Sequence, residues 1–215
     1  MEEASSTITL FGGIKGLIRD GDALEKYLFE FKPEVILVSL SEEHIIGLKD
    51  FLENPYEVQL SDYEIIYGVR LSVYGEVMTP PPIYIETVKY ATSNNVTLIP
   101  LDMNEDTYSG LYTSSMRSMD LVRHSIRKRR LLKRDLKDRT PEEFVRNWER
   151  AINKVSGLRI IDEHRLAFID EKIGSALAQF AGKSIFIVVD YEFVDRVQKF
   201  LESSGTRFTR VFPVN

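Results

Sequence analysis

The segment Gly12-Gly13-Ile14-Lys15-Gly16 combines residue types that suit the binding of an anion. It follows a short β-rich run, residues 7–11, and its glycines let the backbone turn tightly and approach a ligand closely. The N–H groups of such a turn, together with a lysine, can hold a phosphate or a carboxylate. We therefore take as candidate ligand-binding residues Gly12, Gly13 and Lys15.

A turn shaped only by packing is the alternative for this segment. Its spacing is not that of a P-loop, because the Lys-Ser or Lys-Thr pair is missing. The next helix also begins with acidic residues, which would repel an anion at its N-terminus: Asp20, Asp22 and Glu25. The sequence leaves both interpretations open.

Two carboxylates, Glu86 and Asp102, are a candidate catalytic pair, since one lies on a predicted helix and the other at the end of the strand after it. If both reach one pocket, they can act as general acid and general base. The structural alternative is that Asp102 caps a loop and Glu86 pairs with Lys89 or Lys49. The histidines are isolated in the sequence and are assigned to no site: His44, His124 and His164.

Residues 117–139 form a strongly basic segment with a helical pattern. Its arginines suit the carboxylates of a partner, and its apolar residues need a surface to cover them, among them Leu121, Leu132 and Leu136. We therefore predict that this helix serves self-association into a homo-oligomer or the binding of a protein partner. Binding of nucleic acid is the alternative. No aromatic side chain is interleaved to stack on single-stranded bases, which disfavours it.

The composition excludes several classes of function. The chain of 215 residues has a net charge of -5, unlike a protein that binds nucleic acid over its whole surface. It has no cysteine for a disulfide or a thiol nucleophile, and three histidines offer little imidazole for a metal centre, so we predict no metal and no cofactor. The N-terminus is acidic and polar, and no apolar run approaches the roughly 20 residues of a spanning helix. We expect a cytoplasmic protein without membrane contact.

The elements that must position these residues alternate between strands and helices. Continuous apolar runs predict buried strands near residues 7–11, 34–39, 96–101 and 184–189, with an edge strand near 208–214. Such alternation favours parallel crossovers. We predict one α/β domain over residues 1–215, with a mostly parallel central sheet of about four strands, helices on both faces and a basic helical insertion at about 106–160. The strand ends should converge on one cleft lined by Lys15, Ser39, Glu86, Asp102 and Arg165.

These strands and the residues that follow them resemble the TraB/PrgY family, within the set that includes Tiki proteases and erythromycin esterase-like proteins. The family has Gly-x-x-His after its first strand, where this chain has Gly12-Gly13-Ile14-Lys15. The family's glutamate after the second strand is Ser39 here, and its last Gly-x-x-His is matched by Asp190-Tyr191-Glu192-Phe193. Its other motif residues correspond to Glu86, Asp102 and Arg165.

The resemblance implies the fold and a pocket at the strand ends. For Tiki-like members it implies metal-dependent hydrolysis, and for the TraB/PrgY branch the inactivation or limitation of peptide pheromones. Because Lys15 and Phe193 stand where the family has histidines, we expect a non-catalytic protein that keeps a pocket for a small anion. Lys15 and Arg165 would clamp the anion, with Asp102 holding Arg165. The alternative is a weak metal-dependent hydrolase of peptides or esters that uses Glu86 and Asp102 with water or Mg²⁺.

Overall fold

The computed structural model describes residues 7–133 and 138–213 and has an α/β fold, as the sequence predicts. Five parallel strands form one sheet in the order β3-β2-β4-β1-β5. They are β1 (Ile8–Gly13), β2 (Val35–Val38), β3 (Thr97–Pro100), β4 (Ile185–Asp190) and β5 (Thr209–Val211). The strand beyond the expected four is the edge strand β5. Within the described residues the helices are α1 (Ile18–Phe31), α2 (Glu42–Glu53), α3 (Asp62–Leu71), α4 (Pro82–Ser93), α5 (Glu105–Ser115), α6 (Ser118–Lys133), α7 (Pro141–Ile152), α8 (Ser156–Gln179) and α9 (Tyr191–Ser203).

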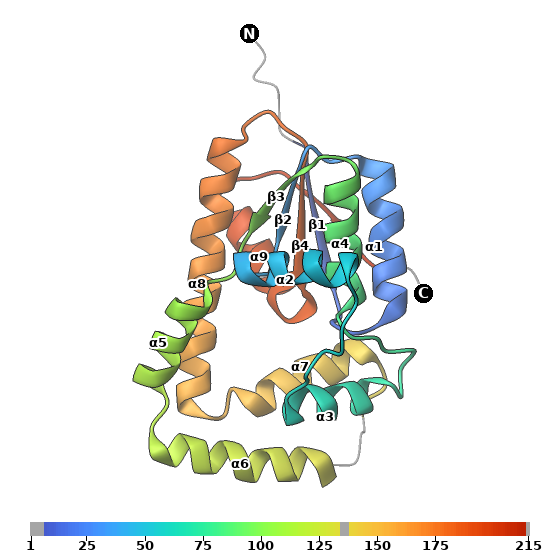
Figure 1. Cartoon of the computed structure of the whole chain (residues 1–215). Coiled ribbons are helices and arrows are strands. Elements are labelled where there is room, and N and C mark those ends of the chain that lie inside the picture. The colour runs from blue at the N-terminus through green and yellow to red at the C-terminus, as the bar shows by residue number, and fades with distance from the viewer. Residues whose placement is uncertain (1–6, 134–137, 214–215) are drawn as a thin grey trace.

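Different helices cover the two faces of the sheet (Figure 1). Because side chains alternate along a strand, β4 sends Phe186 and Val188 to one face and Ile185 and Ile187 to the other. On the first face these side chains pack with α1, α2 and α4. On the second they pack with α8 and α9. Both faces are therefore buried, which explains why the strands are continuous apolar runs.

The connections between strands determine which helix lies on which face. Those from β1 to β2 and from β2 to β3 run toward the β3 edge, and α1 and α4 cover one face. Those from β3 to β4 and from β4 to β5 run the opposite way, and α8 and α9 cover the other face. Crossovers of one hand that run in opposite directions must lie on opposite faces. Neighbouring strands therefore send the chain to opposite faces, which opens a crevice at their carboxyl ends.

A helical layer of α3, α6 and α7 lies beyond these carboxyl ends (Figure 1). Its apolar cluster includes Phe144 and Trp148 from α7 and Ile66 from α3, packed on Ile14 and Leu17 of the segment after β1. The expected insertion at about 106–160 corresponds to α5, α6, α7 and the start of α8. Within the predicted basic segment 117–139, residues 134–137 lie outside the described residues.

Residues 61–78 have a mostly apolar pattern that predicts one long helix, and the structure differs from it. The helix α3 ends at Leu71, and the chain then pairs with the segment after β1. The N–H of Ile18 donates to the carbonyl of Glu76 at 3.0 Å, and the N–H of Met78 donates to that of Gly16 at 2.8 Å. These tertiary hydrogen bonds outweigh the helical preference of the local sequence.

Candidate functional site

One cavity of about 420 Å³ lies at the carboxyl ends of β1, β2, β3 and β4. Each strand or the residues directly after it contribute to its wall, and α8 contributes an arginine: Lys15 after β1, Ser39 after β2, Asp102 after β3, Asp190 of β4 and Arg165. The parallel sheet thus brings together four of the five residues that the sequence assigns to one cleft, namely Lys15, Ser39, Asp102 and Arg165. The apolar part of the wall comes mainly from α2 and the segment after it, with Leu48, Phe51, Tyr56 and Val58.

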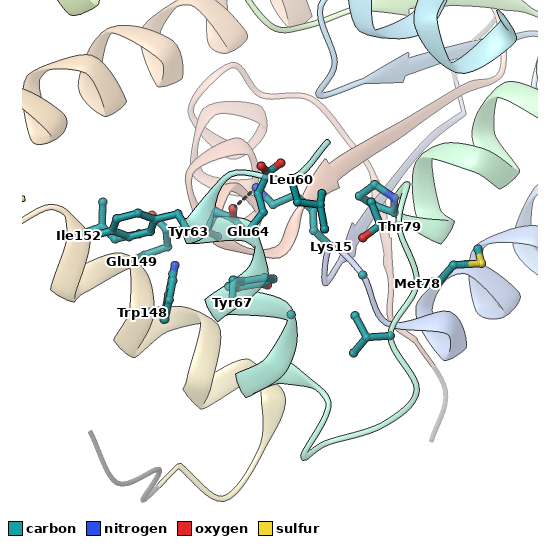
Figure 2. Close-up of a pocket in the computed structure, with 15 residues that line it drawn as sticks. Lys15, Leu60, Tyr63, Glu64, Tyr67, Met78, Thr79, Trp148, Glu149 and Ile152 are labelled. Atoms are coloured by element: carbon teal, nitrogen blue, oxygen red, sulfur yellow. Dashed lines mark ion pairs between the residues drawn. The ribbon is translucent and has the colours of Figure 1, made fainter. Parts of the chain in front are cut away.

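Lys15 contacts two carboxylates that are close in sequence, those of Asp190 and Glu192. Its Nζ is 3.1 Å from Oδ2 of Asp190 and 2.7 Å from Oε1 of Glu192; the second pair is the dashed line in Figure 2. Burial lowers the pKa of Lys15, but the charges of Asp190 and Glu192 outweigh that effect and raise it well above its ordinary value. Lys15 is therefore a fixed cation whose charge is already balanced.

Asp190 belongs to a buried hydrogen-bond network that joins three elements. The hydroxyl of Tyr84 in α4 donates to Oδ1 of Asp190, and the N–H of Asp190 donates to Oγ of Ser39 at 3.2 Å. Oγ of Ser39 also lies 3.4 Å from the Tyr84 hydroxyl. Burial raises the pKa of Asp190 to about 6, although Lys15 opposes the shift. Burial, and then the charge of Asp190, raise the pKa of Tyr84 well above its ordinary value, so its hydroxyl stays a donor.

Arg165 of α8 is held in the wall of the cavity by a bidentate contact with Asp102. Its Nε donates to Oδ1 of Asp102 at 3.2 Å and its Nη2 donates to Oδ2. The guanidinium also lies over the ring of Phe193, with Cζ 5.2 Å from the ring centroid. Burial lowers the pKa of Arg165, but the hydrogen bonds and charge of Asp102 outweigh this effect and raise it. Asp102 leaves Nη1 of the planar guanidinium for a further contact.

Glu86 does not line this cavity, whereas Asp102 does, so the structure does not bring the two carboxylates of the predicted acid–base pair into one pocket. Oε1 of Glu86 is 2.9 Å from Nζ of Lys89, the alternative partner considered from the sequence. The reason is helical geometry: Glu86 comes two residues after Tyr84 in α4, and residues two apart point in different directions. Lys15, which the sequence analysis assigns to the same cleft as Glu86, instead contacts Asp190 and Glu192.

Gly12 and Gly13 lie in strand β1 and not in the turn that the sequence predicts for them. A Cβ on Gly12 would lie 2.4 Å from Cγ2 of Val194 in α9, and one on Gly13 would lie 2.8 Å from Cγ2 of Ile83 in α4. The two glycines therefore let helices approach the strand closely on its two faces, and neither lines the cavity. Gly16 follows, with a φ of 99° that favours glycine, and forms the turn.

Sequence reasoning missed a second cavity of about 290 Å³, which shares Lys15 with the first. It is lined by aromatic side chains of α3 and α7 and by carboxyl groups of α7 and α9: Tyr63, Tyr67, Trp148, Glu149 and Glu192 (Figure 2). In the sequence, Trp148 is one of the apolar residues at helical spacing in the segment that forms α7, and nothing there marks it as part of a cavity. The signal that was available is the i, i+4 pair Tyr63 and Tyr67, which shares one face of α3.

Comparison with protein-family models and with curated proteins finds no match to this chain. Within residues 7–133 and 138–213, no helix is long and apolar enough to cross a membrane. The same residues contain no group of three or more histidine, aspartate or glutamate side chains arranged to hold a metal ion.

Proposed function

We propose that the chain is a non-catalytic, TraB-like ligand-binding protein of the cytoplasm, and that its ligand occupies the cavity at the strand ends. The observation that carries the proposal is the charge at the two positions where the resemblance expects histidines. One position is Lys15 itself, and the other, Phe193, has the guanidinium of Arg165 over its ring. A protonated lysine and a phenylalanine ring offer no ligand atom to a divalent ion, so neither position can replace a metal-binding histidine.

The ligand that fits this cavity is a small amphipathic molecule with an anionic group. Nη1 of Arg165 can donate to a carboxylate or a phosphate, and Arg165 is already oriented by Asp102. Ser39 and Tyr84 contribute hydroxyl groups to the lining, and α2 contributes apolar contacts. Because two carboxylates balance the charge of Lys15, we assign the anion to Arg165 rather than to a clamp of both residues.

A hydrolase that uses Glu86 with Asp102 is not supported, because Glu86 does not line the cavity and Asp102 is engaged by Arg165. Calorimetric titration with acetate, benzoate and inorganic phosphate tests the proposal, with elemental analysis of the purified protein. We expect at least one anion to bind, and Arg165→Gln to weaken it about tenfold or more. Arg196→Gln is the matched control, since Arg196 also pairs with an aspartate through Nε and Nη2 but lies outside the cavity. Stoichiometric metal, or anion binding indifferent to Arg165→Gln, would refute the proposal.

A second part of the proposal is that α6 binds a protein partner or a second copy of the chain. Apolar side chains lie exposed along this helix, and they are Met119, Leu121, Val122 and Ile126. Leu131, in contrast, packs inward against α3 and α7. Basic residues such as Arg123 lie exposed beside the apolar ones and suit carboxylates of a partner.

Light scattering of wild type and of the double variant Leu121→Glu/Ile126→Glu tests this role. We expect an oligomer for the wild type and a monomer for the variant, with Ile46→Glu, an exposed apolar position of α2, as the control. A monomeric wild type that binds nucleic acid, with an affinity that falls steeply as salt increases, would favour the nucleic-acid alternative.

A further inference from the structure

The second cavity has a wall in which three aromatic rings come together. Tyr63 and Tyr67 lie one helical turn apart in α3, and both approach Trp148 of α7 edge-to-face. The ring centroids are 6.0 Å apart for Tyr63 and Trp148 and 5.5 Å apart for Tyr67 and Trp148. Leu60, Met78 and Ile152 complete an apolar lining. A volume of about 290 Å³ suits a small organic molecule.

Two carboxyl groups in this wall have unused bonding capacity. Glu149 follows Trp148 in α7, and its side chain makes no hydrogen bond or ion pair within residues 7–133 and 138–213. The side chain of Glu192 is only 9% exposed and gives Oε1 to Lys15, but its buried Oε2 has no hydrogen-bond partner. A buried carboxylate oxygen without a partner is unfavourable, so Glu192 would gain from a bound donor, and the half-buried Glu149 offers a second acceptor beside it.

The charge balance of the wall favours a positive ligand. Lys15 is shared between Asp190 and Glu192, so its one positive charge faces two negative ones before Glu149 is counted. An anion would meet the carboxyl groups of Glu149 and Glu192. A cation would meet those carboxyl groups and aromatic side chains, whose electron-rich ring faces attract cations when water is excluded.

We propose that this cavity binds a small organic ammonium ion, with its charge against the carboxyl groups of Glu149 and Glu192 and its apolar part among Tyr63, Tyr67 and Trp148. The site is separate from the anion position at Arg165, which lines only the strand-end cavity. The inference therefore stands without the proposed anion-binding function.

The ionisation of Glu149 gives the proposal a distinctive signature. Burial, and then the charge of Glu192, raise its pKa to about 8, so the group is largely protonated at neutral pH. A bound cation stabilises the carboxylate and lowers that pKa, so binding must release a proton. The charged groups that act on Glu149 come from the segment after β1, from β4, α8 and α9, and they are Lys15, Asp190, Asp162 and Glu192.

Calorimetric titration with benzylammonium, benzyl alcohol and benzoate tests the proposal on the full chain near pH 7. These probes share an aromatic ring and differ in charge. We expect benzylammonium to bind about tenfold or more tightly than benzyl alcohol, and benzoate to bind more weakly still. We also expect benzylammonium binding to release a proton, measured as a dependence of the binding enthalpy on the ionisation enthalpy of the buffer. Equal binding of the three probes would show an apolar cavity without charge selectivity and would overturn the proposal, as would preference for benzoate or no binding of benzylammonium.

Variants separate this site from the strand-end cavity. Glu149→Gln should weaken benzylammonium about tenfold and abolish the proton release, whereas Glu171→Gln, an exposed glutamate of α8, should change neither. Arg165→Gln should leave benzylammonium binding intact even if anion binding is lost. If Glu149→Gln does not fold, the pKa of Glu149 followed by NMR in the wild type serves instead: it should fall on saturation with benzylammonium, and an unchanged pKa would overturn the proposal.

Discussion

Replacement of Lys15 by methionine should destabilise the protein in a pH-dependent way. At an effective dielectric constant of about 20, charges about 3 Å apart interact by about 5 to 6 kcal/mol, and Lys15 has two such partners, at 2.7 and 3.1 Å. Desolvation of the ammonium offsets most of that attraction, and loss of one partner from a buried ion pair costs about 3–5 kcal/mol. Because the Lys15 side chain is 33% exposed, we expect the lower end of that range, about 3 kcal/mol, at pH 8.

The loss should shrink in acid. The folded pKa of Asp190, about 6, already lies above its ordinary value, so the wild type loses stability as pH rises toward 6. Without Lys15 the folded pKa of Asp190 rises further, because the charge of Lys15 opposes the shift, and this loss of stability then continues to higher pH. At about pH 5, where Asp190 is largely protonated, the difference between the two proteins should fall to about 1 kcal/mol.

Urea unfolding of wild type and variant at both pH values measures these differences. Lys89→Met is the matched control, because it removes only the exposed pair with Glu86 and should cost less than about 0.5 kcal/mol. A Lys15→Met loss that is equal at the two pH values, or no larger than that of the control, would refute the assignment of Lys15 to a buried carboxylate pair.

Two further predictions concern packing and ionisation. Gly12→Ala should destabilise the fold by about 2 kcal/mol, because the new Cβ would lie 2.4 Å from Val194. Gly110→Ala in α5 is the control: its new Cβ meets nothing within 4 Å, and it should stabilise the fold by about 0.5–1 kcal/mol. Thermal unfolding of the two variants measures these effects, and equal effects would contradict the close packing of α9. Glu149→Gln should become more stable than wild type by about 1 to 2 kcal/mol as pH rises from 5 to 8. In this range the unfolded glutamate is ionised while the folded group, with its pKa of about 8, keeps its proton, so the wild type loses stability that the glutamine variant keeps. Parallel stability curves for the two proteins over that range would show that Glu149 ionises normally.

The sequence predicts much of the fold because its signals are local. The apolar runs of β2 and β4 identify buried strands, and Thr140-Pro141 identifies the start of α7, where Oγ of Thr140 accepts the N–H of Glu143 at 3.2 Å. Parallel strands then place their carboxyl ends at one edge, so the order of strands and helices along the chain is enough to assign Lys15 and Ser39 to one cleft.

What the sequence could not predict depends on contacts between distant segments. Whether Tyr84 or Glu86 faces the sheet depends on the rotation of α4, and an apolar pattern around both does not fix that rotation. The partners of Lys15 come from β4 and α9, far along the chain. The second cavity joins α3, α7 and α9, whose proximity follows only from the packing of the layer beyond the strands.

The strand order has a consequence for how the chain folds. β1 and β2 follow each other in sequence but do not pair, because β4 lies between them, and Ile185 is the register partner of both Ile8 and Val35. A nascent chain that has not yet reached residue 185 therefore has an unfilled slot in the middle of its sheet, with two apolar strand edges exposed. Completion must wait for contacts that span most of the sequence, and such contacts slow folding. Until β4 enters the slot, the growing protein is at its most prone to aggregation.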